Sequence, residues 1–358
     1  MNSRVLVGVA VLVAACVSEA FAYKVRSYDF VEFSMQADVA VHAKSVGCRG
    51  DAIEIVVKAT VFGGPAPDKV EASFTPAWKH EVPREFSGER LVFLSLKEGK
   101  YALVGEGTQS VWPHERGSEG VPYGYTSACD LDLLVKVCKQ LRDFASLPEE
   151  KRLAAVRDLV AAADPFLKRV GFELCSWLLW RHHKEKHEPE VELGSAYALA
   201  RIQSPVRADP SGFYQAVALS SAAPPSAALR VLLRSIEHPS IAKVLRNNAI
   251  MGLAHIASRR GAPLPTLPTE EPVTLDGKLL AIKGWLSKAW PALVRADAVK
   301  ILGALGSPDP LRRMVGRIWL EACAGQSFGF DEAGDDHVRG LSAQKAHAWF
   351  AGQSEPGK

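Results

Sequence analysis

The sequence predicts a multidomain α+β protein in which a small β barrel precedes an all-α array of helical hairpins. Between about residues 37 and 112 apolar and polar residues alternate, which is the period of half-buried strands. From about residue 129 the apolar period becomes helical, and prolines preceded by Asp or Ser mark repeated helix starts. The chain has 358 residues, 47% of them hydrophobic, which predicts about two globular domains and excludes wholesale disorder.

The first 22 residues predict export. Arg4 precedes an apolar run over 5–15, and small residues at 20 and 22 match a signal-peptidase site. The run is shorter than the roughly 20 residues that span a bilayer. Two outcomes stay open: cleavage after Ala22, or lipidation of Cys16 within a lipobox-like segment. We expect an exported bacterial protein, periplasmic or extracellular, whose only membrane contact would be a lipid on Cys16, as in an outer-membrane lipoprotein.

Four parts of the chain follow from these patterns. We expect a signal peptide at 1–22, a β domain at 23–128, a helical repeat domain at 129–325 and a polar C-terminal tail at 326–358. In the β domain, five short strands alternate in polarity over about 39–43, 53–61, 70–74, 92–96 and 101–103. Five strands suit a closed barrel better than a two-sheet sandwich.

The helical region contains internal repeats. Four segments of similar pattern end at Leu159, Leu199, Leu253 and Leu302. The segment from Asp164 to Gly171 also resembles the segment from Asp309 to Gly316. A recurring helix-turn-helix unit predicts stacked helical hairpins.

These residues resemble two known families. The segments at 245–257 (LRNNAIMGLAHIA) and 294–305 (VRADAVKILGAL) resemble the second helices of HEAT repeats, over about 146–324. The first half resembles the netrin- and TIMP-like OB barrels, in the segments at 37–41, 88–94, 100–103 and 125–129. The second resemblance implies an OB-like barrel that can bind a ligand. The tissue inhibitors present a free N-terminal Cys-x-Cys, which a chain starting at Tyr23 or at a lipidated Cys16 lacks, so their inhibitory activity is not implied.

Export changes the expected state of the cysteines, because disulfides form outside the cytosol. Cys129 and Cys138 are separated by about 13 Å along a helix and cannot bond each other. Cys48 is therefore expected to pair with either Cys129 or Cys138.

One pair of side chains has the spacing of metal ligands. His183 and His187 are four residues apart, so both would face one side of a helix. Lys184 stands where a metalloprotease would carry its catalytic glutamate, so the water-activating base is missing. The competing interpretation is a solvated, charged helix end. A second ambiguous residue is Trp112, which either grips a ligand at the barrel mouth or packs against the following helix.

The sequence contains no recognisable catalytic constellation and predicts no cofactor. A net charge of +3 gives no basic field for nucleic acid. We expect a non-catalytic binding or scaffold protein whose helices present a surface to a protein partner. The alternative is a metal-dependent enzyme or a hydrolase inhibitor with a site at the barrel or the barrel–helix junction.

Overall fold

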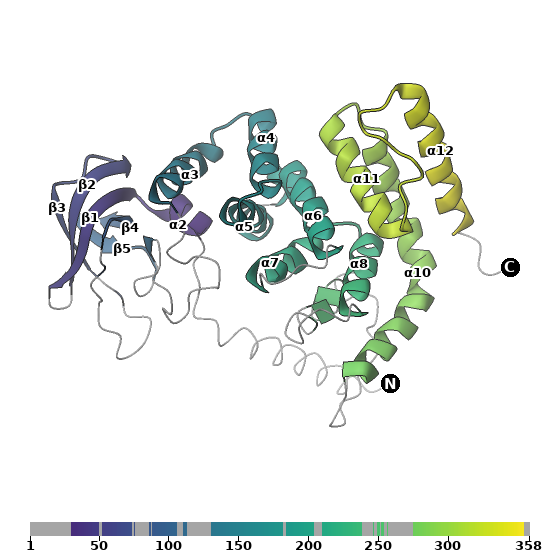
Figure 1. Cartoon of the computed structure of the whole chain (residues 1–358), viewed down its shortest axis with the longest axis horizontal. Helices are drawn as coiled ribbons and strands as arrows, with labels where there is room; N and C mark the ends of the chain where they lie inside the picture. The colour runs from purple at the N-terminus through teal and green to yellow at the C-terminus, as the bar shows by residue number, and fades with distance from the viewer. Residues whose placement is uncertain are drawn as a thin grey trace. The chain divides into compact units, whose positions relative to one another are not determined.

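The computed structural model describes residues 30–49, 52–73, 75, 86, 88–105, 110–112, 130–181, 184–203, 210–237, 246, 249–250, 252–253, 256 and 275–353. The chain forms two compact units, Met1–Ser146 and Leu147–Lys358. The described part of the first contains a β barrel and two helices, and that of the second is helical (Figure 1). The predicted signal peptide, including Cys16, lies outside the described residues.

The five predicted strands are present and close into a barrel. They are β1 (Val39–Arg49), β2 (Ala52–Phe62), β3 (Lys69–Ser73), β4 (Arg90–Lys97) and β5 (Lys100–Leu103). Their order is β1-β2-β3-β5-β4, and pairing of β4 with β1 closes the ring. All neighbours are antiparallel except β3 and β5, which run parallel. A sixth short strand, β6 (Val111–Trp112), pairs with β4 and was not predicted.

Two features of the backbone explain how only five strands can close into a barrel. Three register shifts interrupt the β1–β2 pairing, and such irregularities bend and twist a strand pair. Between β4 and β5, Glu98 and Gly99 both have positive φ, at 53° and 77°. This is the backbone of a tight two-residue hairpin whose twist matches the strands. The alternating apolar side chains then meet in a common interior that includes Val41, Ile55 and Leu94.

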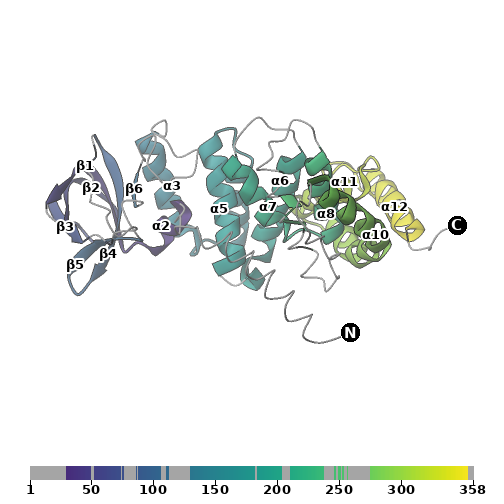
Figure 2. The same cartoon turned by 90° about the horizontal axis from the view of Figure 1, so that it is seen from below.

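Two helices cover the outside of the barrel where β1 and β4 pair. They are α2 (Phe30–Gln36) and α3 (Leu131–Phe144), which lie together beside β4 in both views (Figure 1, Figure 2). Phe30 packs edge-on against Phe93 and Trp112, with ring centroids 5.7 and 5.2 Å apart. Trp112 is 2% exposed, so it belongs to this second core. The structure therefore shows packing, but the rings that Trp112 contacts belong to α2, which precedes it in the chain, whereas the prediction named the following helix.

The unit boundary lies later in the chain than the sequence indicated. Helix α3 was expected to open the helical domain at residue 129, yet it packs against α2, β2 and β4. Arg142 of α3 donates a hydrogen bond to the carbonyl oxygen of Ala37 at 3.1 Å and lies over the Phe62 ring, 4.9 Å from its centre. These contacts attach α3 to the barrel.

The described part of the second unit consists of helices, several of them packed in pairs. They are α4 (Glu149–Val160), α5 (Pro165–Arg181), α6 (Glu188–Gln203), α7 (Pro210–Ser220), α8 (Pro225–Glu237), α10 (Leu275–Leu305), α11 (Pro310–Ala324) and α12 (Asp336–Gly352). A short 3-10 helix, η1 (Lys184–His187), precedes α6. Neighbours along the chain pack together, as α4 with α5, α6 with α7 and α10 with α11 (Figure 2). Helix α6 also contacts α4 and α11.

Two of these hairpins are built alike, as the internal similarity predicted. Asp164 and Asp309 accept hydrogen bonds from backbone amides in the first turns of α5 and α11. One turn further along, Gly171 lies against the backbone of Val160 at the end of α4, and Gly316 lies against that of Leu305 at the end of α10. The same motif thus forms the same close helix crossing twice.

The polar tail is folded in its described part. Asp335 caps α12 by accepting a hydrogen bond from the Val338 amide at 2.9 Å. Helix α12 packs against α10 and buries Ala346 and Phe350. The acidic pair at 335–336 therefore starts a helix, and residues 326–353 belong to the helical unit.

Candidate functional site

The predicted metal pair is only partly described. His183 lies outside the described residues, while His187 ends η1. Its Nδ1 atom is 3.6 Å from the Glu190 carboxylate. Within the described ranges, no group of three or more His, Cys, Asp or Glu side chains is arranged to hold a metal ion. His187 thus belongs to a cluster of polar and charged side chains centred on Glu190.

That cluster joins three helices through a buried carboxylate. Glu190 of α6 is fully buried, and its Oε1 lies 2.6 Å from Nε of Arg152 on α4. Arg152 also donates to the Leu147 carbonyl at 2.7 Å. From α5, the Cys175 thiol donates to the Glu190 carbonyl at 3.7 Å. A paired, hydrogen-bonded charge tolerates such burial, so this cluster holds α4, α5 and α6 in register.

Three of the described cysteines, Cys138, Cys175 and Cys323, are buried and unreactive in character. Burial raises the pKa of the Cys138 and Cys323 thiols to about 12, and it raises that of Cys175 as well. A thiolate is needed for nucleophilic attack, so these residues are unsuited to catalysis. Cys138 and Cys48 are not bonded to each other. Cys129 lies outside the described residues, so its pairing with Cys48 stays a prediction.

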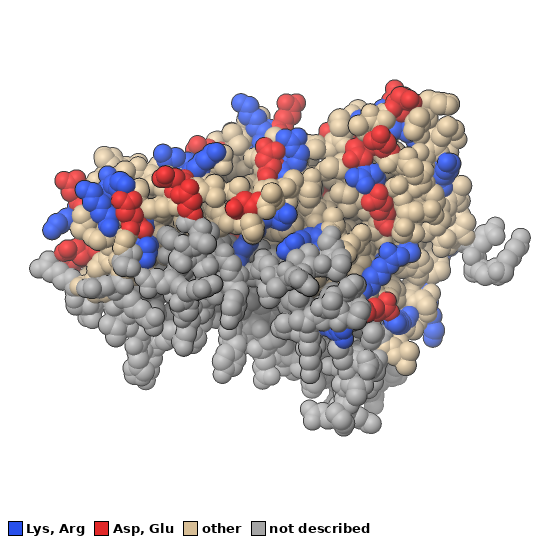
Figure 3. All heavy atoms as spheres, in the orientation of Figure 1, with Lys and Arg blue, Asp and Glu red and all other residues tan. Residues whose placement is uncertain are grey.

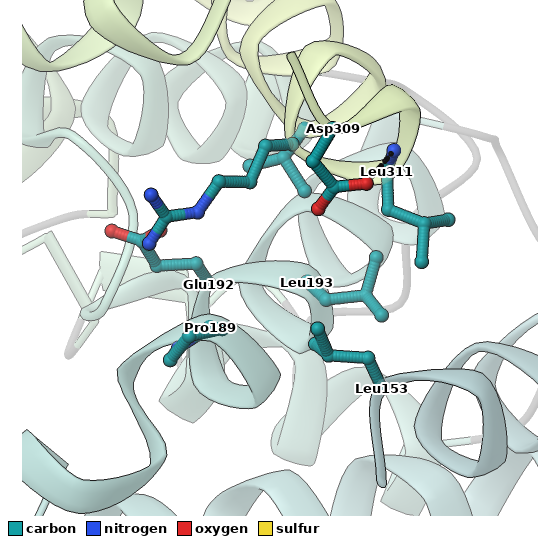
Figure 4. A pocket seen from close by; sticks show the side chains of 8 residues that line it. Leu153, Pro189, Glu192, Leu193, Asp309 and Leu311 are labelled. Atoms are coloured by element: carbon teal, nitrogen blue, oxygen red, sulfur yellow. Dashed lines mark hydrogen bonds between the residues drawn. The ribbon is translucent and has the colours of Figure 1, made fainter. Parts of the chain in front are cut away.

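A small cleft opens where α4, α6 and α11 meet (Figure 4). Its floor is apolar, with Leu153 and Leu193 lying next to each other and Leu311 facing them from the first turn of α11. Glu192 and Asp309 stand at its rim, and Glu192 is held by Lys300 at 2.7 Å. The enclosed space is about 10 Å³, roughly one water molecule, whereas small-molecule pockets span hundreds of Å³. The cleft is therefore too small for a small-molecule ligand.

The same side of α6 carries a tyrosine surrounded by charge. The hydroxyl of Tyr197 is 3.8 Å from Sδ of Met314 on α11. Burial raises the pKa of Tyr197, and this outweighs the opposing effect of the nearby Arg157 guanidinium, so the hydroxyl stays protonated. Around it, Arg157 pairs with Asp158 at 2.9 Å, and Arg317 pairs with Glu332 at 2.7 Å.

We call this surface the α6 face, defined by the cleft residues Leu153, Glu192, Leu193, Asp309, Leu311 and Arg312 together with Tyr197, Met314, Arg157 and Arg317. In the space-filling view, positive and negative side chains are interspersed over α4 and α11 (Figure 3). No single sign dominates, so the face has no broad electrostatic field. The sequence did not identify it, because its members come from three helices that are distant in the chain.

Comparison with protein-family models, with curated proteins and with solved structures gives no match to this chain. None of the helices in the described part of the chain has the length and apolar character needed to cross a bilayer. We therefore infer the function from the geometry of the described residues.

Proposed function

We propose that this chain is an exported, non-catalytic binding or scaffold protein whose helical unit docks a protein partner on the α6 face. One observation carries the proposal: Tyr197 and Met314 from separate helices are in contact, and arginines surround them. Tyr, Met and Arg are the residue types enriched in the centres of protein interfaces. Beside them lies the small cleft with its apolar floor.

The charges of the α6 face favour a specific protein partner. Arg157, Arg317 and Lys300 are each paired with a carboxylate on the same surface. Paired charges hold their side chains in fixed positions, which gives a partner a pattern to match. The interspersed signs also argue against a polyanion such as nucleic acid, which requires an excess of cations.

We further infer that the barrel is of the OB type and that the helices form a HEAT-like array. The barrel inference is supported by five strands in a closed ring with one parallel pair, β3 with β5. The array inference is supported by the matching α4–α5 and α10–α11 hairpins. Export, to the periplasm or beyond, rests on the apolar N-terminal 22 residues.

Site-directed photocrosslinking of the full-length exported chain tests the docking surface. The probe is Tyr197→benzoylphenylalanine, and the matched control is Val299→benzoylphenylalanine, since Val299 is 81% exposed on α10. We expect one discrete adduct from position 197, identified by mass spectrometry, that is absent from position 299. Adding Arg312→Glu at the cleft should abolish it, because it reverses a charge at the rim. Equal adducts from both positions, or none from position 197, would contradict the proposal.

A further inference from the structure

Two arginines of α8 converge on one point at the end of α11. Arg230 and Arg234 are one turn apart, and α11 ends at Gly325, whose φ is 82°. A Cβ atom on Gly325 would lie 2.9 Å from Nη2 of Arg230 and 3.3 Å from Nη2 of Arg234. Both guanidinium groups therefore converge on Gly325 and lie so close to it that a side chain there would collide with them.

Arg230 is held in place without a carboxylate from the described residues. Arg230 donates a hydrogen bond to the Cys323 carbonyl and lies over the Trp290 ring, 5.9 Å from its centre. Neither Arg230 nor Arg234 forms an ion pair with an acidic residue in the described part of the chain. Burial lowers the pKa of Arg230, and the adjacent positive charge of Arg234 lowers it further. The two like charges therefore repel each other in the folded chain.

The end of α11 offsets only part of this charge. The last carbonyls of a helix carry about half an elementary negative charge. Two guanidinium groups carry two full positive charges at neutral pH, because even a lowered arginine pKa stays far above 7. Capping of α11 therefore leaves most of the positive charge uncompensated.

We propose that Arg230 and Arg234 form a binding site for an oxyanion, the carboxylate or phosphate group of a ligand. Guanidinium forks bind such groups through paired, charge-assisted hydrogen bonds. The Trp290 ring keeps the Arg230 plane fixed, and the exposed side chain of Arg234 is accessible to an anion from solvent. The site lies at the opposite end of α11 from the cleft of the α6 face, so it stands independently of the proposed function.

Anion-dependent thermal stability of the full chain tests the site. Sodium phosphate, sodium acetate and sodium chloride are compared at constant ionic strength. We expect phosphate or acetate to raise the melting temperature above that in chloride, since a ligand that binds only the folded state stabilises it. The oxyanion that does so identifies the ligand group.

Arg234→Gln is the informative variant, because Arg234 makes no hydrogen bond to the described part of the chain that its loss would break, whereas Arg230 donates to the Cys323 carbonyl. It should weaken the apparent affinity for the oxyanion by about tenfold, the effect of one charge-assisted hydrogen bond. Arg234→Lys, which keeps the charge but not the fork, should fall in between. Lys345→Gln, an exposed lysine of α12, is the matched loss of charge and should leave the affinity unchanged.

Three results would overturn the proposal. The first is a wild-type melting temperature that is the same in all three salts. The second is an equal loss of anion dependence in Arg234→Gln and Lys345→Gln, which would indicate a general charge effect. The third is a lower stability of Arg234→Gln with its anion dependence intact, which would leave Arg234 with only a helix-capping role.

Discussion

Replacing a glycine by alanine should have opposite effects at different helical positions of this protein. At Gly171 a Cβ atom would lie 2.7 Å from the backbone nitrogen of Val160, and at Gly316 it would lie 2.7 Å from that of Leu305. Real Cβ atoms do not approach so closely, and backbone cannot rotate away. At Gly284, within α10, no atom lies within 4 Å of the added carbon.

The expected magnitudes follow from two competing effects. Overpacking a helix contact costs up to about 3 kcal/mol when a rigid neighbour must move. Alanine favours a helix interior over glycine by about 1 kcal/mol. Gly171→Ala and Gly316→Ala should therefore each lower the free energy of unfolding by about 2 kcal/mol, whereas Gly284→Ala should raise it by about 1 kcal/mol.

Thermal unfolding followed by far-UV circular dichroism measures the difference. A change of 1 kcal/mol shifts the melting temperature by about 2–4 °C in a domain of this size, so Gly171→Ala should melt about 4–8 °C below wild type. Gly316→Ala should shift by a similar amount if the two hairpins are equivalent. A melting temperature of either variant at or above that of Gly284→Ala would refute the close helix crossing as the reason for the glycines.

Three further predictions concern buried and paired charges. Arg152→Leu should lower the free energy of unfolding, measured in urea, by about 3–5 kcal/mol, because it leaves the buried Glu190 carboxylate without its partner. Adding Glu190→Leu should restore most of the loss. A single variant as stable as wild type would contradict this. Burial raises the pKa of the Cys323 thiol from the ordinary 9.0 to about 12. Its contribution to the free energy of unfolding should therefore be intact below pH 9.0 and decline as the pH rises toward 12, because the thiol ionises first in the unfolded chain. Cys323→Ala should flatten that part of the stability profile, and an unchanged slope would argue against it. The hydrogen bond from Lys58 is the largest cause of the lowered pKa of Glu89, so NMR titration of Lys58→Gln should show that pKa rising toward 4.5. An unchanged pKa would mean that the ion pair is absent in solution.

Much of the architecture follows from patterns within single segments. The alternation through Ile53 and Ile55 determines which side chains of a strand point inward, so five strands could be located without knowing their partners. Similarly, Asp309 before Pro310 marks the start of a helix, because the cap and the fixed proline φ act within one turn. The repeated motif ending at Gly171 and Gly316 identified matching hairpins for the same reason.

Contacts between segments that are distant in the chain could not be predicted from such local patterns. Nothing within residues 131–144 indicates that α3 belongs to the barrel, since Arg142 meets its partners, Ala37 just after α2 and Phe62 in β2, only after folding. The α6 face likewise requires Tyr197 and Met314 to meet from separate helices, and the oxyanion site requires Arg230, Arg234 and Gly325 to converge. Periodicity reports which face of an element is buried. Which elements then bury those faces against each other depends on the packing of the whole unit, and that packing alone placed both candidate sites.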